Sequence, residues 1–342
     1  MSSRRDRRPR RGGRRRLAAL ATLLAPLAVV AALLIPARED GRGPAPVAAA
    51  GVPASEGSGC AGGGQTSLGP APATSVRLAG VDEFRVRLRK PPRAGLVFDL
   101  GTGEVLWRRN PRRRLPIASL TKMMTALVVV ERTRPRERFR VARAAFRYTG
   151  SGIGRLPKRR LVDVEALLNG LMIVSGNDAA IALAHHVAGS ERRFVALMNR
   201  RARALGLTCT RFVDSHGLAG GNRSCTADLA ALARADMRTR RIARIVRRER
   251  ARFRFPVKGG FLDLEGHNPL VRAGYPGAIG LKTGYTDAAG RCFVGVVRRK
   301  GRTLGVVLLN SPDPLAQSRK LLARAYGDPA PRGEPGDVVL NR

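Results

Sequence analysis

The stretch "IASLTKMMTAL", Ile117–Leu127, places Ser119 and Lys122 three residues apart in an otherwise apolar, helix-like run. Side chains three apart on a helix lie on one face, within contact distance. A lysine among apolar neighbours loses hydration, which lowers its pKa and makes the neutral amine accessible as a base. A neutral lysine beside a serine hydroxyl can activate that serine as a nucleophile. By itself the spacing leaves three alternatives open: surface residues, a helix cap with an incidental lysine, or a nucleophile with its base.

A second motif, "SGND", places Ser175 and Asn177 after the apolar run "LLNGLMIV". In a tight turn after a helix, a serine and an amide two residues apart can point at one spot. In isolation the same letters favour an N-cap for the helix that follows.

A third motif, "LKTGYT", joins Lys282, Thr283 and Gly284 at the edge of an expected strand. A cation, a hydroxyl and a close backbone approach can together cradle a carboxylate. Taken singly, the motif is equally consistent with an ordinary edge strand that ends in a turn.

Together, and in this order, the three motifs resemble those of the penicillin-binding-protein and serine β-lactamase superfamily. Within it the chain is most similar to the low-molecular-weight D-alanyl-D-alanine carboxypeptidases, peptidase family S11. The resemblance runs from about Arg93 to Tyr326. It is carried by the blocks "RLPIASLTKMMTALVV", "LLNGLMIVSGNDAAIALAHHVAGS", "FVALMNRRARALGLTCTRFVDSHGL" and "GLKTGYTDAAGRCFV".

The resemblance implies a two-step acyl transfer without metal or cofactor. Ser119 is then the acylated nucleophile and Lys122 its general base. Ser175 passes a proton to the departing amine, and Asn177 positions Lys122 and the acyl amide. D-Alanine leaves a peptidoglycan stem peptide, water hydrolyses the acyl-enzyme, and β-lactams are expected to acylate Ser119.

The resemblance also assigns the residues around the K-T-G motif. Lys282 and Thr283 are expected to bind the terminal carboxylate of the substrate. The backbone N–H groups of Ser119 and of Tyr285, directly after Gly284, are expected to form the oxyanion hole. A positive charge on Lys282 also helps to keep Lys122 neutral.

The order of elements predicts an α+β domain whose terminal strands share one sheet. The resemblance implies a β-lactamase/DD-peptidase-like fold, with an antiparallel sheet flanked by helices plus a mainly helical subdomain. A hairpin is expected around Gly101–Gly103, and a helix from Pro116 to about Arg132. The other expected helices are 179–186, 190–205, 224–234 and 314–326, and the other expected strands are 278–282, 292–298 and 303–309.

The N-terminal part has the pattern of a targeting segment followed by a flexible linker. Residues 1–16 are strongly basic, and residues 17–35 carry no charge and as a helix are about 28 Å long, enough to cross a bilayer. We therefore expect a transmembrane signal anchor or signal peptide, with the protein outside the cytoplasmic membrane. Residues 36–78 are expected to be a disordered linker, 79–328 the catalytic domain, and 329–342 a disordered tail.

Export would determine whether the cysteines are in an oxidising compartment. Outside the cytoplasm, Cys209 and Cys225 are expected to form a disulfide that staples the loop between them. Cys292 lies in an apolar run and is expected to be a buried thiol, whereas Cys60 suggests no role.

The charge allows a nucleic-acid partner but does not favour one. Lys+Arg number 64 against 25 Asp+Glu, a net charge of +39. Aromatic residues make up only 4%, and the arginines are spread over every segment rather than interleaved with aromatics. We therefore predict no nucleic-acid partner.

Several rival functions remain. A class A-like β-lactamase needs a glutamate in an E-x-x-L-N loop, but "EALLN", Glu165–Asn169, precedes the S-x-N motif instead of following it. A DD-endopeptidase stays open, because Tyr285 stands where some relatives have histidine. A Ser-His-Asp triad is disfavoured, since Asp214 and His216 are expected to be too close in sequence to face one another. The non-enzyme alternative is a membrane-tethered binder of anionic wall polymer, which would survive the loss of Ser119.

Overall fold

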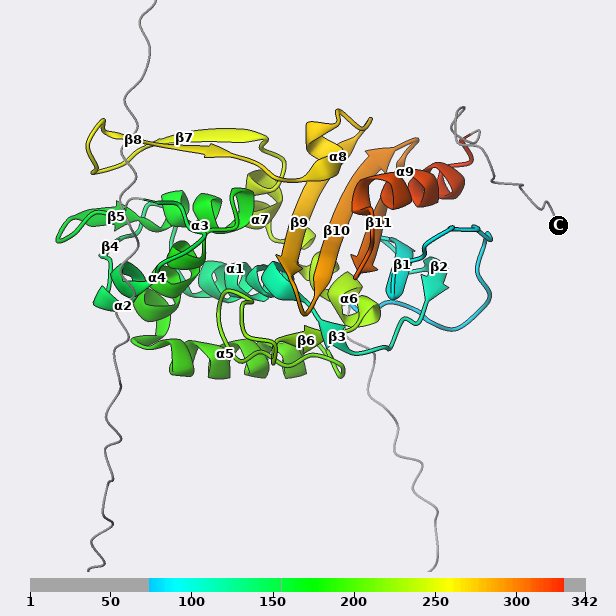
Figure 1. Cartoon of the computed structure of the whole chain (residues 1–342), viewed down its shortest axis with the longest axis horizontal. Coiled ribbons are helices and arrows are strands. Elements are labelled where there is room, and N and C mark those ends of the chain that lie inside the picture. The colour runs from blue at the N-terminus through cyan, green and yellow to red at the C-terminus, as the bar shows by residue number, and fades with distance from the viewer. Residues whose placement is uncertain (1–73, 155, 329–342) are drawn as a thin grey trace, which may run out of the picture. The chain divides into compact units, whose positions relative to one another are not determined.

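The computed structural model of the chain describes residues 74–154 and 156–328, which belong to one compact unit (Figure 1). The basic segment, the apolar segment 17–35, most of the linker and the tail 329–342 lie outside the described residues. None of the helices in the described part of the chain combines the length and the apolar character needed to cross a bilayer.

The five long strands of the main sheet lie near the two ends of the described chain, and most of the helices lie between them. In chain order its elements are β1 Ala94–Asp99, β2 Val105–Arg109, β3 Leu115–Pro116, η1 Ala118–Leu120, α1 Thr121–Arg132, β4 Arg138–Arg140, α2 Arg143–Arg147, β5 Leu161–Asp163, α3 Val164–Ile173, α4 Asn177–Ala188, α5 Glu191–Ala204, β6 Arg223–Ser224, α6 Thr226–Arg238, α7 Arg240–Ile245, β7 Arg250–Arg254, β8 Phe261–Glu265, α8 Pro269–Arg272, β9 Ala278–Thr286, β10 Gly290–Arg299, β11 Arg302–Leu309 and α9 Pro314–Ala325.

A five-stranded antiparallel sheet joins the two ends of the domain in the order β2-β1-β11-β10-β9. The first strand pairs with the last along its length, from Ala94 opposite Leu309 to Asp99 opposite Leu304. The predicted α+β class and the shared sheet of the terminal strands are therefore confirmed. Strand β9 lies at the free edge of the sheet.

Both faces of the sheet are covered, which explains the near-continuous apolar runs in its central strands. On one face, Val306 and Leu308 of β11 belong to the cluster that contains Leu321 and Leu322 of α9. The alternate residues of β11 face the larger core, to which α1, α3, α4 and α6 contribute. Figure 1 shows the mainly helical part, with α1 to α5 and α7, on the side of the sheet away from α9.

Three sequence predictions need correction. The expected helix from Pro116 begins only at Thr121, because Leu115 and Pro116 pair with β6 and Ser119 lies in the 3-10 turn η1. The K-T-G strand does not stop at Lys282 but continues to Thr286, paired with β10 throughout. Residues 74–78 of the expected disordered linker are packed, because Val76 and Leu78 contact the core and the Arg77 N–H donates to the Gly103 carbonyl at 2.8 Å.

Candidate active site

Ser119 lies in the tight turn η1, where β3 ends and α1 begins. The preceding Ala118 has a φ of 47°, a left-handed conformation that costs a residue with a Cβ about 1–2 kcal/mol. Two glycines from distant segments allow their backbones to approach this turn. A Cβ on Gly284 of β9 would lie 3.0 Å from the Ser119 nitrogen, and one on Gly217 would lie 2.9 Å from the same atom. The edge strand and the 209–225 loop therefore both pack against the turn that carries the serine.

Lys122, one turn further on, is fully buried and makes three polar contacts. Its Nζ lies 3.0 Å from Ser119 Oγ, 2.5 Å from Asn177 Oδ1 and 2.7 Å from the His216 carbonyl oxygen. These are a hydroxyl and two oxygens that can only accept hydrogen bonds. The S-x-x-K and S-x-N motifs, far apart in sequence, therefore meet at one amine.

Burial lowers the pKa of Lys122 well below the usual value for a lysine, and the positive charge of Lys282 lowers it further. The carboxylates of Asp214 and Asp178 act in the opposite direction, but the net effect favours the neutral amine. Desolvation, the first cause, is the one expected from the apolar neighbours in the sequence. The second cause is the expected effect of Lys282.

Ser175 lies in the turn between α3 and α4, and Asn177 is the first residue of α4. Ser175 has a φ of 63°, and its Oγ is buried without a hydrogen-bond partner among the described residues. Buried hydroxyls rarely lack a partner, and such an orphan in a cleft is available to a ligand. Asn177 uses its Oδ1 for Lys122 and donates from Nδ2 to the Tyr148 hydroxyl at 2.7 Å.

The K-T-G residues lie on β9 with alternating directions. Lys282 is 2% exposed and donates to the Thr283 carbonyl at 2.9 Å, and burial lowers its pKa to about 7. Thr283 points to the other side, because successive side chains of a strand alternate between the two faces of a sheet. Tyr285 is 62% exposed, and its hydroxyl donates to Asp287 at 2.9 Å.

A cleft of about 420 Å³ opens beside this edge strand. Residues of all three motifs and of strand β10 line it, namely Ser119, Ser175, Thr283, Gly284, Tyr285 and Arg291. Lys122, Asn177 and Lys282 are joined to them through the contacts above. The structure thus brings together all eight residues that the sequence singles out for catalysis and substrate binding.

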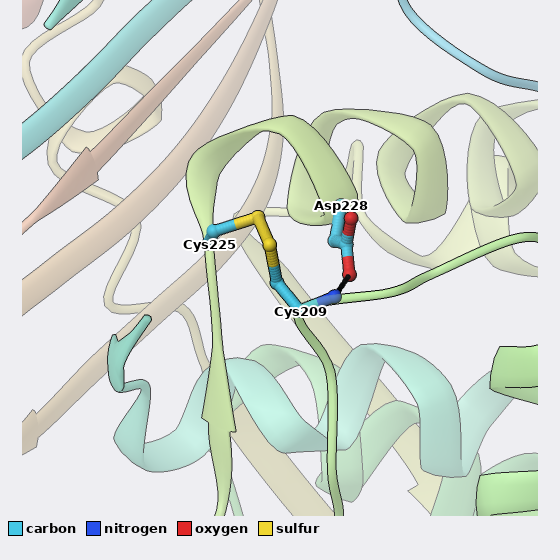
Figure 2. Close-up of side chains that lie close together, drawn as sticks. All are labelled: Cys209, Cys225 and Asp228. Carbon is cyan, nitrogen blue, oxygen red and sulfur yellow. Dashed lines mark hydrogen bonds between the residues drawn. A yellow bond between two sulfur atoms is a disulfide. The ribbon is translucent and has the colours of Figure 1, made fainter. Parts of the chain in front are cut away.

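A disulfide joins Cys209 to Cys225, whose Cα atoms are 5.6 Å apart, and the Cys209 N–H donates to Asp228 Oδ2 at 2.7 Å (Figure 2). Both sulfurs are used in this bond, so the cluster of two cysteines and one aspartate offers no thiolate pair to a metal. The loop that it closes carries the carbonyl oxygen that accepts from Lys122. Cys292 is a buried free thiol, as predicted, and burial raises its pKa to about 11.

The expectation that Asp214 and His216 cannot face one another is wrong. His216 Nδ1 lies 3.5 Å from Asp214 Oδ2, because the intervening turn folds back and Asp214 accepts the His216, Gly217 and Ala219 N–H groups. The contact of His216 with the site's lysine comes from its carbonyl oxygen. No sequence motif marks a backbone carbonyl, so this contact could not be predicted from the sequence.

The α3 residues that match the E-x-x-L-N pattern accept hydrogen bonds from arginines and do not line the cleft. Glu165 accepts from Arg241 at 3.0 Å and Asn169 accepts from Arg248 at 2.9 Å. Tyr148, in contrast, belongs to the site through Asn177 and was not singled out from the sequence.

The comparisons with known proteins agree with this geometry. The family model described as Peptidase_S11, D-alanyl-D-alanine carboxypeptidase, matches residues 91–313. The D-alanyl-D-alanine carboxypeptidase DacB2 of Mycobacterium tuberculosis is 36% identical over 222 residues, which make up 64% of this chain and 75% of the relative. DacF of Bacillus subtilis is 31% identical over 243 residues, 68% of this chain but only 62% of the relative's length.

Solved structures give the same result. A D-alanyl-D-alanine carboxypeptidase from M. tuberculosis superposes with a TM-score of 0.67 at 31% identity, over 79% of this chain and 98% of the other. Some similar proteins carry a different name, since relatives from Escherichia coli and Haemophilus influenzae are D-alanyl-D-alanine endopeptidases.

Proposed function

The chain belongs to the D-alanyl-D-alanine carboxypeptidase family, peptidase family S11, and we propose that it removes the C-terminal D-alanine from peptidoglycan stem peptides through an acyl-enzyme on Ser119. The observation that carries this proposal is the position of Lys122, 3.0 Å from Ser119 Oγ and held by two acceptors. The penicillin-binding fold of the relatives makes β-lactams inhibitors that acylate the same serine.

The neutral form of Lys122 fits its three partners. A neutral amine has two N–H donors and one lone pair. Asn177 Oδ1 and the His216 carbonyl can only accept, so they take the two donors. The lone pair then faces the Ser119 hydroxyl, which donates its proton to it. The geometry therefore orients the base as well as placing it.

Acylation follows from this arrangement. Ser119 Oγ bonds to the carbonyl carbon of the penultimate D-alanine while its proton moves to Lys122 Nζ. The C–N bond then breaks, and the departing amine takes a proton that Lys122 supplies through Ser175, whose buried Oγ has no other partner among the described residues. Water attacks the ester in the second step, with Lys122 again accepting the proton, and Ser119 is regenerated.

The edge strand β9 orients the substrate. An extended peptide can lie along a free strand edge and form main-chain hydrogen bonds with it. The backbone N–H groups of Ser119 and Tyr285 stabilise the oxyanion, and the Thr283 hydroxyl binds the terminal carboxylate. Lys282 adds positive charge from the other face of the strand.

We propose in addition that the enzyme acts outside the cytoplasmic membrane, held there by residues 17–35. The uncharged length of that segment and the arginines before it support this location. The Cys209–Cys225 disulfide also supports it, because such bonds persist in oxidising compartments. Nucleic acid has no part in the proposal.

The test is D-alanine release from an N-acylated peptide ending in Lys-D-Ala-D-Ala, by the full-length chain in detergent and by its Ser119→Ala variant. Release by the first and none by the second is the expected result. Cleavage of crosslinked wall fragments without D-alanine release would replace the carboxypeptidase by an endopeptidase, and rapid penicillin turnover by a β-lactamase. Inactivity on all three substrates would refute the enzyme.

A further inference from the structure

None of the motif residues offers the substrate carboxylate a permanently charged partner. This point rests on the proposed function, in which a free D-alanine carboxylate must bind beside Thr283. Lys282 is the only cation of the K-T-G motif, and it is buried with its amine donating to the Thr283 carbonyl. A pKa of about 7 leaves it roughly half charged at neutral pH.

Arg291 of β10 provides a cation on the correct face of the sheet. It stands opposite Tyr285 in the ladder, and Thr283 stands opposite Phe293. Opposite residues of an antiparallel pair share a face, and diagonal neighbours lie about 7–8 Å apart, within reach of a long side chain. Thr283, Tyr285 and Arg291 therefore share one face, and all three line the cleft.

Among the described residues, one hydrogen bond positions the guanidinium of Arg291. Its Nη1 donates to the Pro312 carbonyl at 2.5 Å, in the segment that leads into α9 and lines the same cleft. That contact uses one of the five N–H donors of an arginine. The fork geometry of the remaining donors suits a carboxylate, with which arginine forms two parallel hydrogen bonds.

The other ionisable groups of the cleft do not compete for this role. Burial lowers the pKa of His267, and the nearby charges of Lys282 and Arg272 lower it further, so its imidazole is neutral at neutral pH. Asp313 also lines the cleft but is negative, and its carboxylate accepts the Ala316 N–H as the N-cap of α9.

We propose that Arg291 is a substrate-binding residue whose guanidinium pairs with the terminal carboxylate of the stem peptide and so selects peptides with a free D-alanine carboxyl end. Arg291 lies outside the three motifs that define the site. It adds to Thr283 a charge that does not depend on pH in the physiological range.

The experiment compares two peptides that differ only at their C-terminus, N-acylated Lys-D-Ala-D-Ala and its C-terminal amide. The full-length enzyme is expected to prefer the free acid. Arg291→Gln should lose about 10- to 100-fold in kcat/KM on the acid, the usual value of a charged hydrogen bond, and little on the amide. Arg291→Lys should recover part of the loss. Arg298→Gln, which removes the same charge from an exposed position on β10, should leave both peptides unchanged.

Two results would overturn the proposal. An equal loss on acid and amide would mean that Arg291 acts by holding the Pro312 segment, and no loss would mean that it does not bind substrate. Failure of the proposed function gives a different result, because the unmodified enzyme would then cleave neither peptide, releasing no D-alanine from the acid and no D-alanine amide from the amide. In that case the rate at which a penicillin, which carries a comparable carboxylate, acylates Ser119 still separates Arg291→Gln from Arg298→Gln.

Discussion

Replacing Gly217 by alanine tests whether the 209–225 loop sets the position of the nucleophile. Gly217 has a φ of 97°, and a Cβ added there would point at the turn that carries Ser119. An alanine Cβ there would overlap the Ala118 carbonyl oxygen and lie 2.5 Å from the carbonyl carbon. Carbon atoms in contact lie about 3.5–4.0 Å apart, so the two backbones must separate by about 1 Å.

The expected effects are separable. Left-handed strain costs about 1–2 kcal/mol, which corresponds to a Tm lower by about 2–8 °C in a domain of this size. A misplacement of about 1 Å at a reacting group can cost about 100-fold in rate, so kcat for D-alanine release should fall by at least that factor. The displacement acts on Ser119 and on the neighbouring His216 carbonyl that accepts from Lys122.

The measurements are kcat, the rate of penicillin acylation and Tm, each beside Gly220→Ala. Gly220 lies in the same loop, and a Cβ there would meet no atom within 4 Å. It should therefore retain both activity and Tm. If Gly217→Ala lowered Tm but kept the kcat of the unmodified enzyme, the loop would support the fold without positioning the serine, and the reasoning would be refuted.

Three further predictions concern charge and crosslinking. Lys282→Gln removes a positive charge that lowers the pKa of Lys122, so that pKa should rise and the acidic limb of penicillin acylation against pH should move to higher pH; an unmoved limb would show no coupling. Replacing Cys209 and Cys225 by serine should cost about 3 kcal/mol, a Tm lower by about 6–12 °C, and dithiothreitol should lower the Tm of the parent alone. Asp236 is fully buried, with neither carboxylate oxygen hydrogen-bonded among the described residues, and burial raises its pKa well above the usual value. Its contribution to stability is therefore complete below about pH 4 and is lost as pH rises, so Asp236→Asn should raise Tm by a few degrees at pH 7 and not at pH 3.5, as thermal denaturation at both pH values would show.

The parts of the site that the sequence could predict are those set by short spacings of distinctive residue types. Ser119 and Lys122 meet because they are three residues apart in one continuous turn and helix. Their contact is local and needs no tertiary packing to form. The apolar letters around Lys122 also indicated the burial that lowers its pKa. The K-T-G letters predicted a strand edge at Lys282 and Thr283, although the strand continues to Thr286 and turns the two side chains to opposite faces.

The parts that could not be predicted depend on tertiary contacts or on the backbone. Tyr148 reaches Asn177 from the position directly after α2, and no motif in the sequence surrounds it. The His216 carbonyl acts through an atom that every residue has. Pro116 favoured a helix start, but its pairing with Arg223 in the β3–β6 ladder overrides that local preference.

The two buried lysines impose opposite requirements on one site. Lys122 must lose its proton to act as a base, and the charge of Lys282 promotes that loss. Lys282 must keep its proton to attract a carboxylate, yet the burial that serves catalysis lowers its pKa to about 7. An entering carboxylate raises the pKa of a nearby amine, so substrate binding itself restores the charge on Lys282. The first attraction then has to come from a group whose charge does not vary, and a guanidinium on the cleft wall meets that requirement without adding a third buried cation. On this argument Arg291 and Lys282 have different tasks, the capture of the carboxylate and the adjustment of the base.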